Sequence, residues 1–305
     1  MTVAFISHPD CHLHDMGGDH PESPLRLDTI KDEVDASRLD PLLELMDAPL
    51  ASRDQLALVH RVDYIDSVFN TAPAHGLAEL DPDTWMNPHT LNAALRAAGA
   101  GVMAVDRVMS GRNHAAFCSV RPPGHHTERQ RAMGFCIFNN VAIAAAYALQ
   151  AYTLKRVAIV DFDVHHGNGT EDIFYHHQAV MLCSSFQSPL YPYSGVGTLP
   201  DHIVNVPLPA GTGSKEFREA IKSKILPALE AFRPELILFS AGFDGHNEDP
   251  LAHFRLVETD YSWITQQVRE VADRHAQGRI VSLLEGGYAL HALGRSVVAH
   301  LRALI

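Results

Sequence analysis

Basic residues are scarce in this chain and never cluster. The 305 residues include 24 Lys and Arg against 36 Asp and Glu, which gives a formal net charge of -12. Nucleic-acid binding depends on clustered positive charge facing phosphates, and no run of basic residues is present. The sequence therefore argues against a nucleic-acid partner. The excess of negative charge would favour a cationic substrate or partner, or would serve solubility alone, and composition leaves both open.

Cysteine is also rare, and the chain lacks long apolar runs. Its four cysteines, Cys11, Cys118, Cys136 and Cys183, show no CxxC spacing, so neither a thiolate zinc site nor a disulfide framework is predicted. The first residues lack the basic and apolar regions of a signal peptide, and no stretch approaches the length of a membrane span. We therefore expect a cytoplasmic protein in a reducing compartment, without a membrane partner.

The patterns that are present indicate an α/β protein. Hydrophobic residues make up 46% of the chain and charged residues 20%, as in ordinary globular proteins. Short apolar runs alternate with longer segments of helical periodicity, which predicts a parallel sheet with right-handed crossovers in one domain, residues 1–305. The expected strands are 3–6, 115–120, 157–160, 179–183, 203–206, 236–240 and 280–284, and the main expected helices are 24–34, 52–69, 90–109, 141–151, 214–232, 258–275 and 290–304.

Local signals refine these boundaries. Ser23 followed by Pro24 predicts a helix N-terminus capped by Ser23, and Thr170 is the expected N-cap of a helix after the run 157–160. Residues 81–84 are expected to open a loop, because they combine Asp, Pro and Thr.

The most informative stretch is 157–170, where an apolar run ends in carboxylates, imidazoles and glycines. The run is typical of a buried parallel strand, whose carboxyl end is where such sheets place ligands. Asp163 and His165 are two residues apart, so both side chains point to the same side of an extended segment. An Asp and a His that converge in this way suit a zinc ion.

Three further strand ends carry polar groups. His125 and His126 follow a Pro-Pro-Gly turn, Asp244 ends the run 236–240, and Tyr288 follows Glu285 and two glycines. Because the carboxyl ends of parallel strands meet at one edge of a sheet, we expect these groups to lie close together. Taken alone, the histidines could be loop residues and Tyr288 a packed core residue.

Together these residues indicate hydrolysis. Asp163, His165 and Asp244 would be three zinc ligands that leave one position for water, the arrangement of a catalytic rather than a structural site. Zinc would polarise a carbonyl and acidify the bound water, and His125 or His126 would accept the water proton and return it to a leaving group.

Two more residues complete the predicted chemistry. Tyr288 would donate a hydrogen bond to the oxyanion, and Asp161 would orient one imidazole. The expected product of such a site is amide or ester cleavage. A second metal site in the loop containing His8, Cys11, His12, His14 and His20 is an alternative to a surface loop, although the spacing is irregular.

Four segments, 121–126, 161–170, 240–244 and 284–288, resemble the signature segments of the zinc-dependent histone deacetylase family. The resemblance extends from His20-Pro21-Glu22 to the last helix and is closest to class II-like members, which include bacterial histone deacetylase-like amidohydrolases and acetylpolyamine amidohydrolases. It implies the arginase/deacetylase fold, with an eight-stranded parallel sheet and helices on both faces. It also implies hydrolysis of N-acyl groups on amines, usually acetyl-lysine.

The resemblance implies a role for each matching residue. Asn168 stands where class I relatives have an aspartate paired to the second histidine. By this resemblance, the zinc ligands are Asp163, His165 and Asp244, the acid/base pair is His125 and His126, and Tyr288 polarises the carbonyl. It also implies that the substrate tunnel is lined by Gly134, Phe135, Tyr191 and Leu251, and that Arg26 lies beneath the site near the acetate exit. It further implies that a structural potassium ion is bound by Asp161, Asp163, His165 and Ser184.

Substrate choice rests on one position. Relatives that act on acetylpolyamines tend to have an acidic residue where this chain has Leu251. An acyl-lysine, or a similar substrate whose chain is uncharged next to the acyl group, is therefore favoured. Glu248 and Asp249 keep the acetylpolyamine alternative open. An acyl-lysine-binding pseudoenzyme is disfavoured because every implied catalytic group is present, and a two-manganese arginase-like site lacks the extra carboxylates it would need. Homo-oligomer formation is left open.

Overall fold

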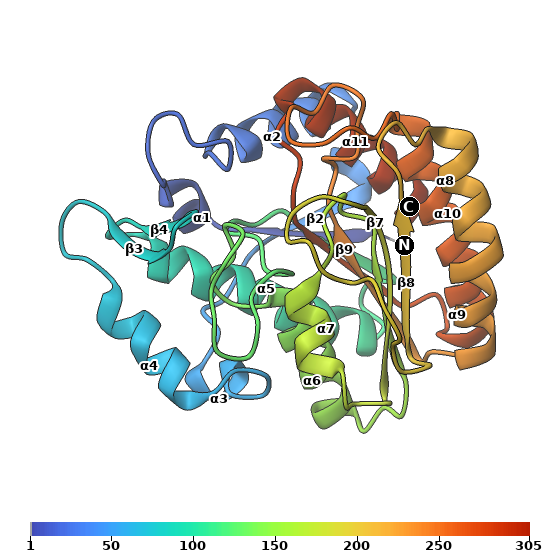
Figure 1. Ribbon diagram of the computed structural model, residues 1–305, viewed down its shortest axis with the longest axis horizontal. Coiled ribbons are helices and arrows are strands. Elements are labelled where there is room, and N and C mark those ends of the chain that lie inside the picture. The colour runs from blue at the N-terminus through green and yellow to red at the C-terminus, as the bar shows by residue number, and fades with distance from the viewer. Residues whose placement is uncertain (1) are drawn as a thin grey trace.

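An eight-stranded sheet forms the centre of the computed structural model, which describes residues 2–305 (Figure 1). The strand order is β2-β1-β5-β10-β9-β6-β7-β8, and every pairing is parallel. This confirms the expected fold class. The strands are β1 (Val3–Ser7), β2 (Leu43–Asp47), β5 (Ala115–Cys118), β6 (Val157–Asp161), β7 (Val180–Gln187), β8 (Ile203–Leu208), β9 (Leu236–Ala241) and β10 (Ile280–Leu284).

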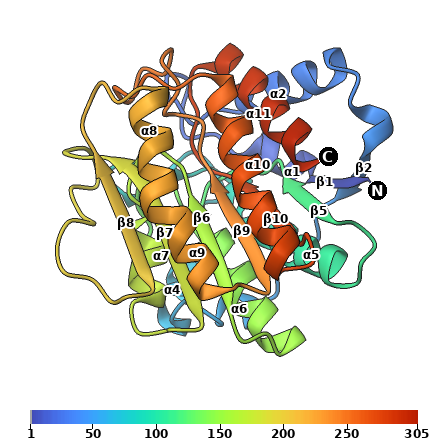
Figure 2. The same ribbon diagram turned by 90° about the vertical axis from the view of Figure 1, so that its right-hand side faces the viewer.

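Helices cover both faces of this sheet (Figures 1 and 2). One face packs against α2 (Leu25–Ala36), α8 (Ser214–Ala220), α9 (Leu226–Phe232), α10 (Glu258–His275) and α11 (Leu290–Leu304). The other packs against α5 (Thr90–Met109), α6 (Asn140–Tyr152) and α7 (Asn168–Phe174). The remaining elements are α1 (Pro9–Leu13), a 3-10 turn (Asp40–Leu42), α3 (Arg53–Leu56), α4 (Val62–Thr71), a π-helical turn (Ile221–Ile225) and the hairpin of β3 (Ala78–Asp81) and β4 (Thr84–Met86).

The central strands are apolar runs because both of their faces are covered. Every residue of β5, β6, β7, β9 and β10 is buried. Along β9 the side chains alternate, with Ile237 and Phe239 in one core and Leu236 and Leu238 in the other. Within residues 2–305, no helix combines the length and the apolar character that crossing a membrane would require.

Two helix starts differ from the sequence-based expectation. Ser23 does not cap α2: Pro24 occupies the N-cap position and no side chain bonds to the free amides. The helix α7 begins at Asn168 after Gly167, so Thr170 lies inside it rather than capping it. The Thr170 hydroxyl instead accepts a hydrogen bond from Asn139 Nδ2 at 3.2 Å, a tertiary contact that sequence spacing does not reveal.

Three other elements were predicted wrongly or not at all. The expected helix 52–69 is two helices, α3 and α4, because the chain between them bonds to a distant loop: Arg61 N donates to Arg129 O at 3.0 Å. The expected loop 81–84 is shorter than predicted: Asp81 ends β3, Thr84 begins β4, and only residues 82–83 form the turn of the hairpin. The edge strand β2 was not anticipated, since it is short and its alternation of Leu43, Glu44 and Leu45 is broken at Met46.

A neutral histidine is buried between the sheet and its C-terminal helices. His300 of α11 is fully buried among the rings of Phe117, Phe162, Phe239 and Phe243, with centroids 5.5–5.9 Å away. Its Nδ1 lies 2.6 Å from Thr265 Oγ1 and its Nε2 lies 2.8 Å from Ser282 Oγ. Neither partner is charged, and burial lowers the pKa of His300 to about 3.

We expect this histidine to make the fold acid-sensitive. Between pH 6.5 and about 3 the unfolded chain binds a proton at His300 and the folded chain does not, so stability is full above pH 6.5 and falls as the pH drops. At pH 5 the loss is about 2 kcal/mol. Urea unfolding at pH 7.5 and 5.0 should show a smaller loss in His300→Gln than in wild type, whereas His75→Gln, at an exposed position, should behave as wild type. Equal losses in all three proteins would contradict the assignment.

Candidate metal centre and active site

The sheet order brings the four polar strand ends together. The strands β5, β10, β9 and β6 are consecutive neighbours in the sheet. The carboxyl end of β5 leads into His125 and His126, and that of β10 leads into Tyr288. The end of β9 leads into Asp244, and the end of β6 leads into Asp163 and His165. Four separate stretches of the chain therefore deliver their side chains to one edge, as the strand-end rule predicts.

Asp163, His165 and Asp244 form a buried group able to hold a metal ion. One ligand atom from each lies within 4.8 Å of the others, and no second group of this kind occurs among residues 2–305. His165 Nδ1 lies 3.1 Å from both Asp163 Oδ1 and Asp244 Oδ2. Burial alone would lower the pKa of His165, but the two carboxylates raise it to about 10. This excess of buried negative charge favours a bound cation, and the donor set of one imidazole and two carboxylates suits zinc.

Main-chain amides fix the two carboxylates. Asp163 accepts from His165 N and from Gly286 N, both at 2.9 Å, and Asp244 accepts from Val164 N at 2.9 Å. Gly286 must lack a side chain, because a Cβ built there would lie 2.0 Å from Asp244 Oδ2 and 2.7 Å from Asp163 Oδ2. The Gly286 backbone can therefore lie against both carboxylates only because the residue is glycine.

The two adjacent histidines have different partners. His125 Nδ1 lies 2.9 Å from Asp161 Oδ2, and His126 Nδ1 lies 2.8 Å from Asn168 Oδ1. Burial lowers the pKa of His125, but the carboxylates of Asp161 and Asp163 outweigh it and raise that pKa well above the usual value. Burial, together with the positive charge of His125 and His165, lowers the pKa of His126 well below the usual value. The environment therefore favours the protonated form of His125 and the neutral form of His126.

Asn168 sets the tautomer of the neutral histidine. Its Nδ2 donates to Glu128 Oε1 at 2.9 Å and to His126 O at 3.3 Å, so its Oδ1 faces His126 Nδ1 as an acceptor. His126 then carries its hydrogen on Nδ1 and presents Nε2 as a free acceptor.

Arg26 supports the segment that carries Tyr288. It is fully buried, its Nε donates to Gly287 O at 2.7 Å and its Nη2 donates to Glu285 O. Glu22 balances its charge, accepting from Arg26 Nη1 at 3.0 Å and from the Arg121 guanidinium. Arg26 is thus a buried structural cation beneath the site, 5.1 Å from the centroid of the Tyr288 ring.

A buried glutamate holds the turn before the two histidines. Glu285 Oε2 accepts from Gly124 N at 2.7 Å and from His125 N at 3.1 Å, and Ser240 Oγ donates to Oε1 at 3.2 Å. Burial raises the pKa of Glu285 to about 7. Sequence reasoning noted Glu285 only as part of a motif, because acceptors of main-chain amides leave no spacing pattern.

A cavity of about 250 Å³ opens onto these groups. His126, His165 and Tyr288 line it, whereas His125 does not. The cavity is also lined by the four residues that were expected in a substrate tunnel, Gly134, Phe135, Tyr191 and Leu251. Three further lining residues were not anticipated: Asp83, Leu190 and Tyr193. The hairpin holds one wall, since Asp83 Oδ1 accepts from Gly134 N and Thr84 Oγ1 accepts from Phe135 N, both at 3.0 Å.

Asp249 and Glu248, the two acidic residues that kept an acetylpolyamine substrate open, have other partners in the structure. Asp249 is buried, and its carboxylate accepts three main-chain amides. Glu248 is paired with Arg295 Nη2 at 2.7 Å. Neither residue lines the cavity; Asp83 is the acidic residue that does.

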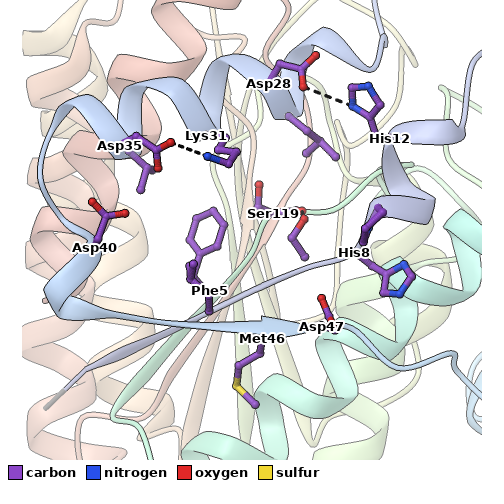
Figure 3. Close-up of a pocket in the computed structure, with 15 residues that line it drawn as sticks. Phe5, His8, His12, Asp28, Lys31, Asp35, Asp40, Met46, Asp47 and Ser119 are labelled. Carbon is purple, nitrogen blue, oxygen red and sulfur yellow. Dashed lines mark hydrogen bonds and ion pairs between the residues drawn. The ribbon is translucent and has the colours of Figure 1, made fainter.

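A second cavity, of about 430 Å³, lies between α2 and the strands β1 and β2 (Figure 3). Phe5 and Met46 contribute apolar lining, and exposed aspartates surround it, with Asp35 paired to Lys31 and Asp28 to His12. None of the residues expected at the catalytic site lines it. The alternative of a second metal site in this region is not supported: His14 is buried against Thr90 and Glu22, and within residues 2–305 no group able to hold a metal includes Cys11 or the nearby histidines.

Comparisons with known proteins agree with this geometry. Residues 20–304 match the histone deacetylase domain. The chain is 39% identical to a histone deacetylase-like amidohydrolase of Pseudomonas aeruginosa, over 88% of this chain and 73% of the relative, and 33% identical to a probable deacetylase of Archaeoglobus fulgidus, over 95% and 82%. The crystal structure of the HDA15 HD domain superposes with a TM-score of 0.93 at 33% identity, covering 99% of this chain and 88% of that one.

The close packing of Gly286 yields a test of the metal centre. In Gly286→Ala the new methyl group must displace Asp163 or Asp244, so we expect zinc affinity to fall about 10- to 100-fold, as for other changes that disturb ligand orientation. Metal content after dialysis against a competing chelator measures this. Gly213→Ala is the control, because its Cβ meets nothing nearer than 3.6 Å, and it should retain zinc as wild type does. Equal retention in both variants would contradict the proposed ligands.

Proposed function

This chain belongs to the histone deacetylase family and is a hydrolase that acts on amides, and from that premise we propose that it is a zinc-dependent deacylase. Its reaction would convert an N-acetyl-lysine, or a similar N-acylated amine, to the free amine and acetate. Three side chains able to hold a metal lie together, and one of them, His165, lines the same cavity as His126 and Tyr288; this arrangement carries the proposal. We assign the activity to a single catalytic domain, residues 1–305.

Asp163, His165 and Asp244 would hold the zinc ion. A bound zinc would polarise the amide carbonyl and acidify a water molecule in the remaining coordination position. The chain itself supplies the proton carriers, the hydrogen-bond donor and the walls that position the substrate.

His126 is the better placed of the two histidines to move a proton. It lines the cavity, and the Asn168 contact leaves its Nε2 free to accept the water proton. The same proton would pass to the amine nitrogen as the carbon–nitrogen bond breaks. His125 would stay protonated against Asp161 and stabilise negative charge nearby.

Tyr288 would donate its hydroxyl hydrogen to the developing oxyanion. Burial raises the pKa of this hydroxyl well above the usual value, so it remains a donor. Phe135 and Tyr191 line the cavity and would hold the apolar chain of an acyl-lysine between their rings. The Phe135 ring stands edge-on to that of Tyr288, with 5.9 Å between the centroids. Arg26 would lie beneath the reacting groups, towards the acetate exit.

A structural potassium ion is supported by an unpaired hydroxyl. Ser184 Oγ is buried and has no hydrogen-bond partner in the part of the chain that the structure describes, and Ser184 is the register partner of Asp161 on the neighbouring strand. Buried polar atoms are rarely left unpaired, so a cation that takes Ser184 Oγ as a ligand would resolve the deficit. We propose that backbone carbonyls and side chains around Asp161, Asp163, His165 and Ser184 hold this ion, while the side chains of Asp163 and His165 remain free to bind zinc.

The substrate class can be tested directly. We expect the zinc-loaded protein to hydrolyse an acetyl-lysine peptide with higher kcat/KM than N-acetylputrescine or N8-acetylspermidine, because Leu251 lines the cavity where an acid would favour a cation. The three substrates are assayed side by side. Preference for the acetylpolyamines would establish the alternative substrate class, and binding without turnover of any of the three would indicate a pseudoenzyme.

The role of Tyr288 gives a sharper test of mechanism. Tyr288→Phe should lower kcat by about 10²- to 10³-fold, as expected for loss of one oxyanion donor, while zinc content stays unchanged. Tyr193→Phe is the matched control, since Tyr193 lines the same cavity but is 80% exposed. A Tyr288→Phe enzyme of wild-type kcat would remove Tyr288 from the mechanism.

The potassium proposal predicts an ion-specific stabilisation. Potassium should raise the Tm of the wild-type protein more than sodium does, and Ser184→Ala should weaken potassium binding about tenfold, as expected for loss of one neutral ligand. Ser185→Ala is the control, because Ser185 Oγ is also buried and unpaired. If the two variants respond to potassium alike, Ser184 is not a ligand.

A further inference from the structure

A buried carboxylate contacts both sides of the proposed catalytic cavity. Asp249 is 6% exposed and lies in the loop between β9 and α10. Its Oδ1 accepts from Leu251 N at 3.0 Å, and its Oδ2 accepts from Tyr288 N at 2.7 Å and from Ala289 N at 3.1 Å. Leu251 and Tyr288 both line the cavity.

No basic side chain pairs with Asp249 within residues 2–305. Burying a carboxylate without a counterion is costly, and here the compensation comes from three main-chain N–H groups. The positive end of α11, which begins at Leu290, adds to it. The three N–H groups therefore stabilise the buried charge of Asp249, and the position of the carboxylate depends on the positions of these amides.

The peptide group that precedes the Tyr288 side chain is held from two directions. Its carbonyl, Gly287 O, accepts from Arg26 Nε at 2.7 Å, and its N–H, on Tyr288, donates to Asp249. Gly287 has a φ of +125°, a region open mainly to glycine, and glycine has no side chain that would restrict the backbone to this conformation. The two side-chain contacts hold it there.

We propose that Asp249 is a positioning residue that couples the tunnel residue Leu251 to the oxyanion donor Tyr288. One oxygen holds the loop that carries Leu251, and the other holds the segment that carries Tyr288. A shift of either segment is transmitted through one rigid carboxylate. This inference rests on the proposed deacylase function for its catalytic consequence, and on geometry alone for the coupling.

The two oxygens can be separated by substitution. Asp249→Ala removes both acceptors, so we expect kcat to fall about 100-fold, the cost of misplacing a catalytic group by roughly 1 Å. Asp249→Asn retains one acceptor oxygen, which should face the two amides of Tyr288 and Ala289. The amide nitrogen then faces Leu251 N, so we expect near wild-type kcat and a KM raised about fivefold, the effect of one lost hydrogen bond.

A double-mutant cycle distinguishes action through Tyr288 from general damage. If Asp249 positions Tyr288, then Asp249→Ala should cost less than about threefold in kcat when Tyr288 is already Phe, because contacting groups are not additive. A full 100-fold loss in the Tyr288→Phe background would overturn the coupling. Glu248→Gln is the matched control: it is the neighbouring acid, it is paired with Arg295, and it should leave kcat and KM unchanged.

Amide hydrogen exchange tests the coupling without any activity. The amides of Leu251, Tyr288 and Ala289 should lose protection in Asp249→Ala, and that of Leu251 alone should lose it in Asp249→Asn. Unchanged protection at Tyr288 in Asp249→Ala would refute the proposal. A wild-type protein that binds zinc but hydrolyses no acyl-lysine or acetylpolyamine would refute the proposed function instead, and the exchange result would still decide on Asp249.

Discussion

Buried carboxylates that accept main-chain N–H groups hold this site together. Asp163 accepts the amide of Gly286 from the end of β10, and Asp244, at the end of β9, accepts the amide of Val164 from the end of β6. Glu285, at the end of β10, accepts amides of the turn before His126. Each carboxylate thus joins the ends of two strands, and because desolvation makes an unpaired carboxylate costly, each contact must persist in the folded protein.

The order of the sheet makes these contacts possible. The strands β5, β10, β9 and β6 come from distant parts of the chain but are consecutive neighbours in space. Their four apolar runs could be read from the sequence, and the strand-end rule predicted that the polar groups after them would meet. Apolar runs do not encode which strand lies beside which. The eight-stranded sheet was expected only from the resemblance to a known family, and it is present.

The residues that sequence reasoning missed act through the backbone or across long separations. Glu285 bonds to amides 160 and 161 residues away, and Arg121 pairs with Glu22 across 99 residues. No local spacing signals such contacts, because any residue supplies an amide. One wrong helix cap has the same origin: Thr170 has a good capping side chain, but a tertiary contact with Asn139 uses its hydroxyl.

The distribution of acidic residues bears on the substrate as well. A net charge of -12 would by itself favour a cationic amine, yet the acids near the cavity already have partners. Asp249 is bound to amides, Glu248 to Arg295, and one oxygen of Asp83 to Gly134 N and Thr84 Oγ1. Among the residues that line the cavity, the second oxygen of Asp83 is the carboxylate atom left for a polyamine, and Leu251 presents an apolar surface. Local geometry, rather than net charge, is therefore the ground on which we propose an acyl-lysine substrate, whose own side chain is uncharged.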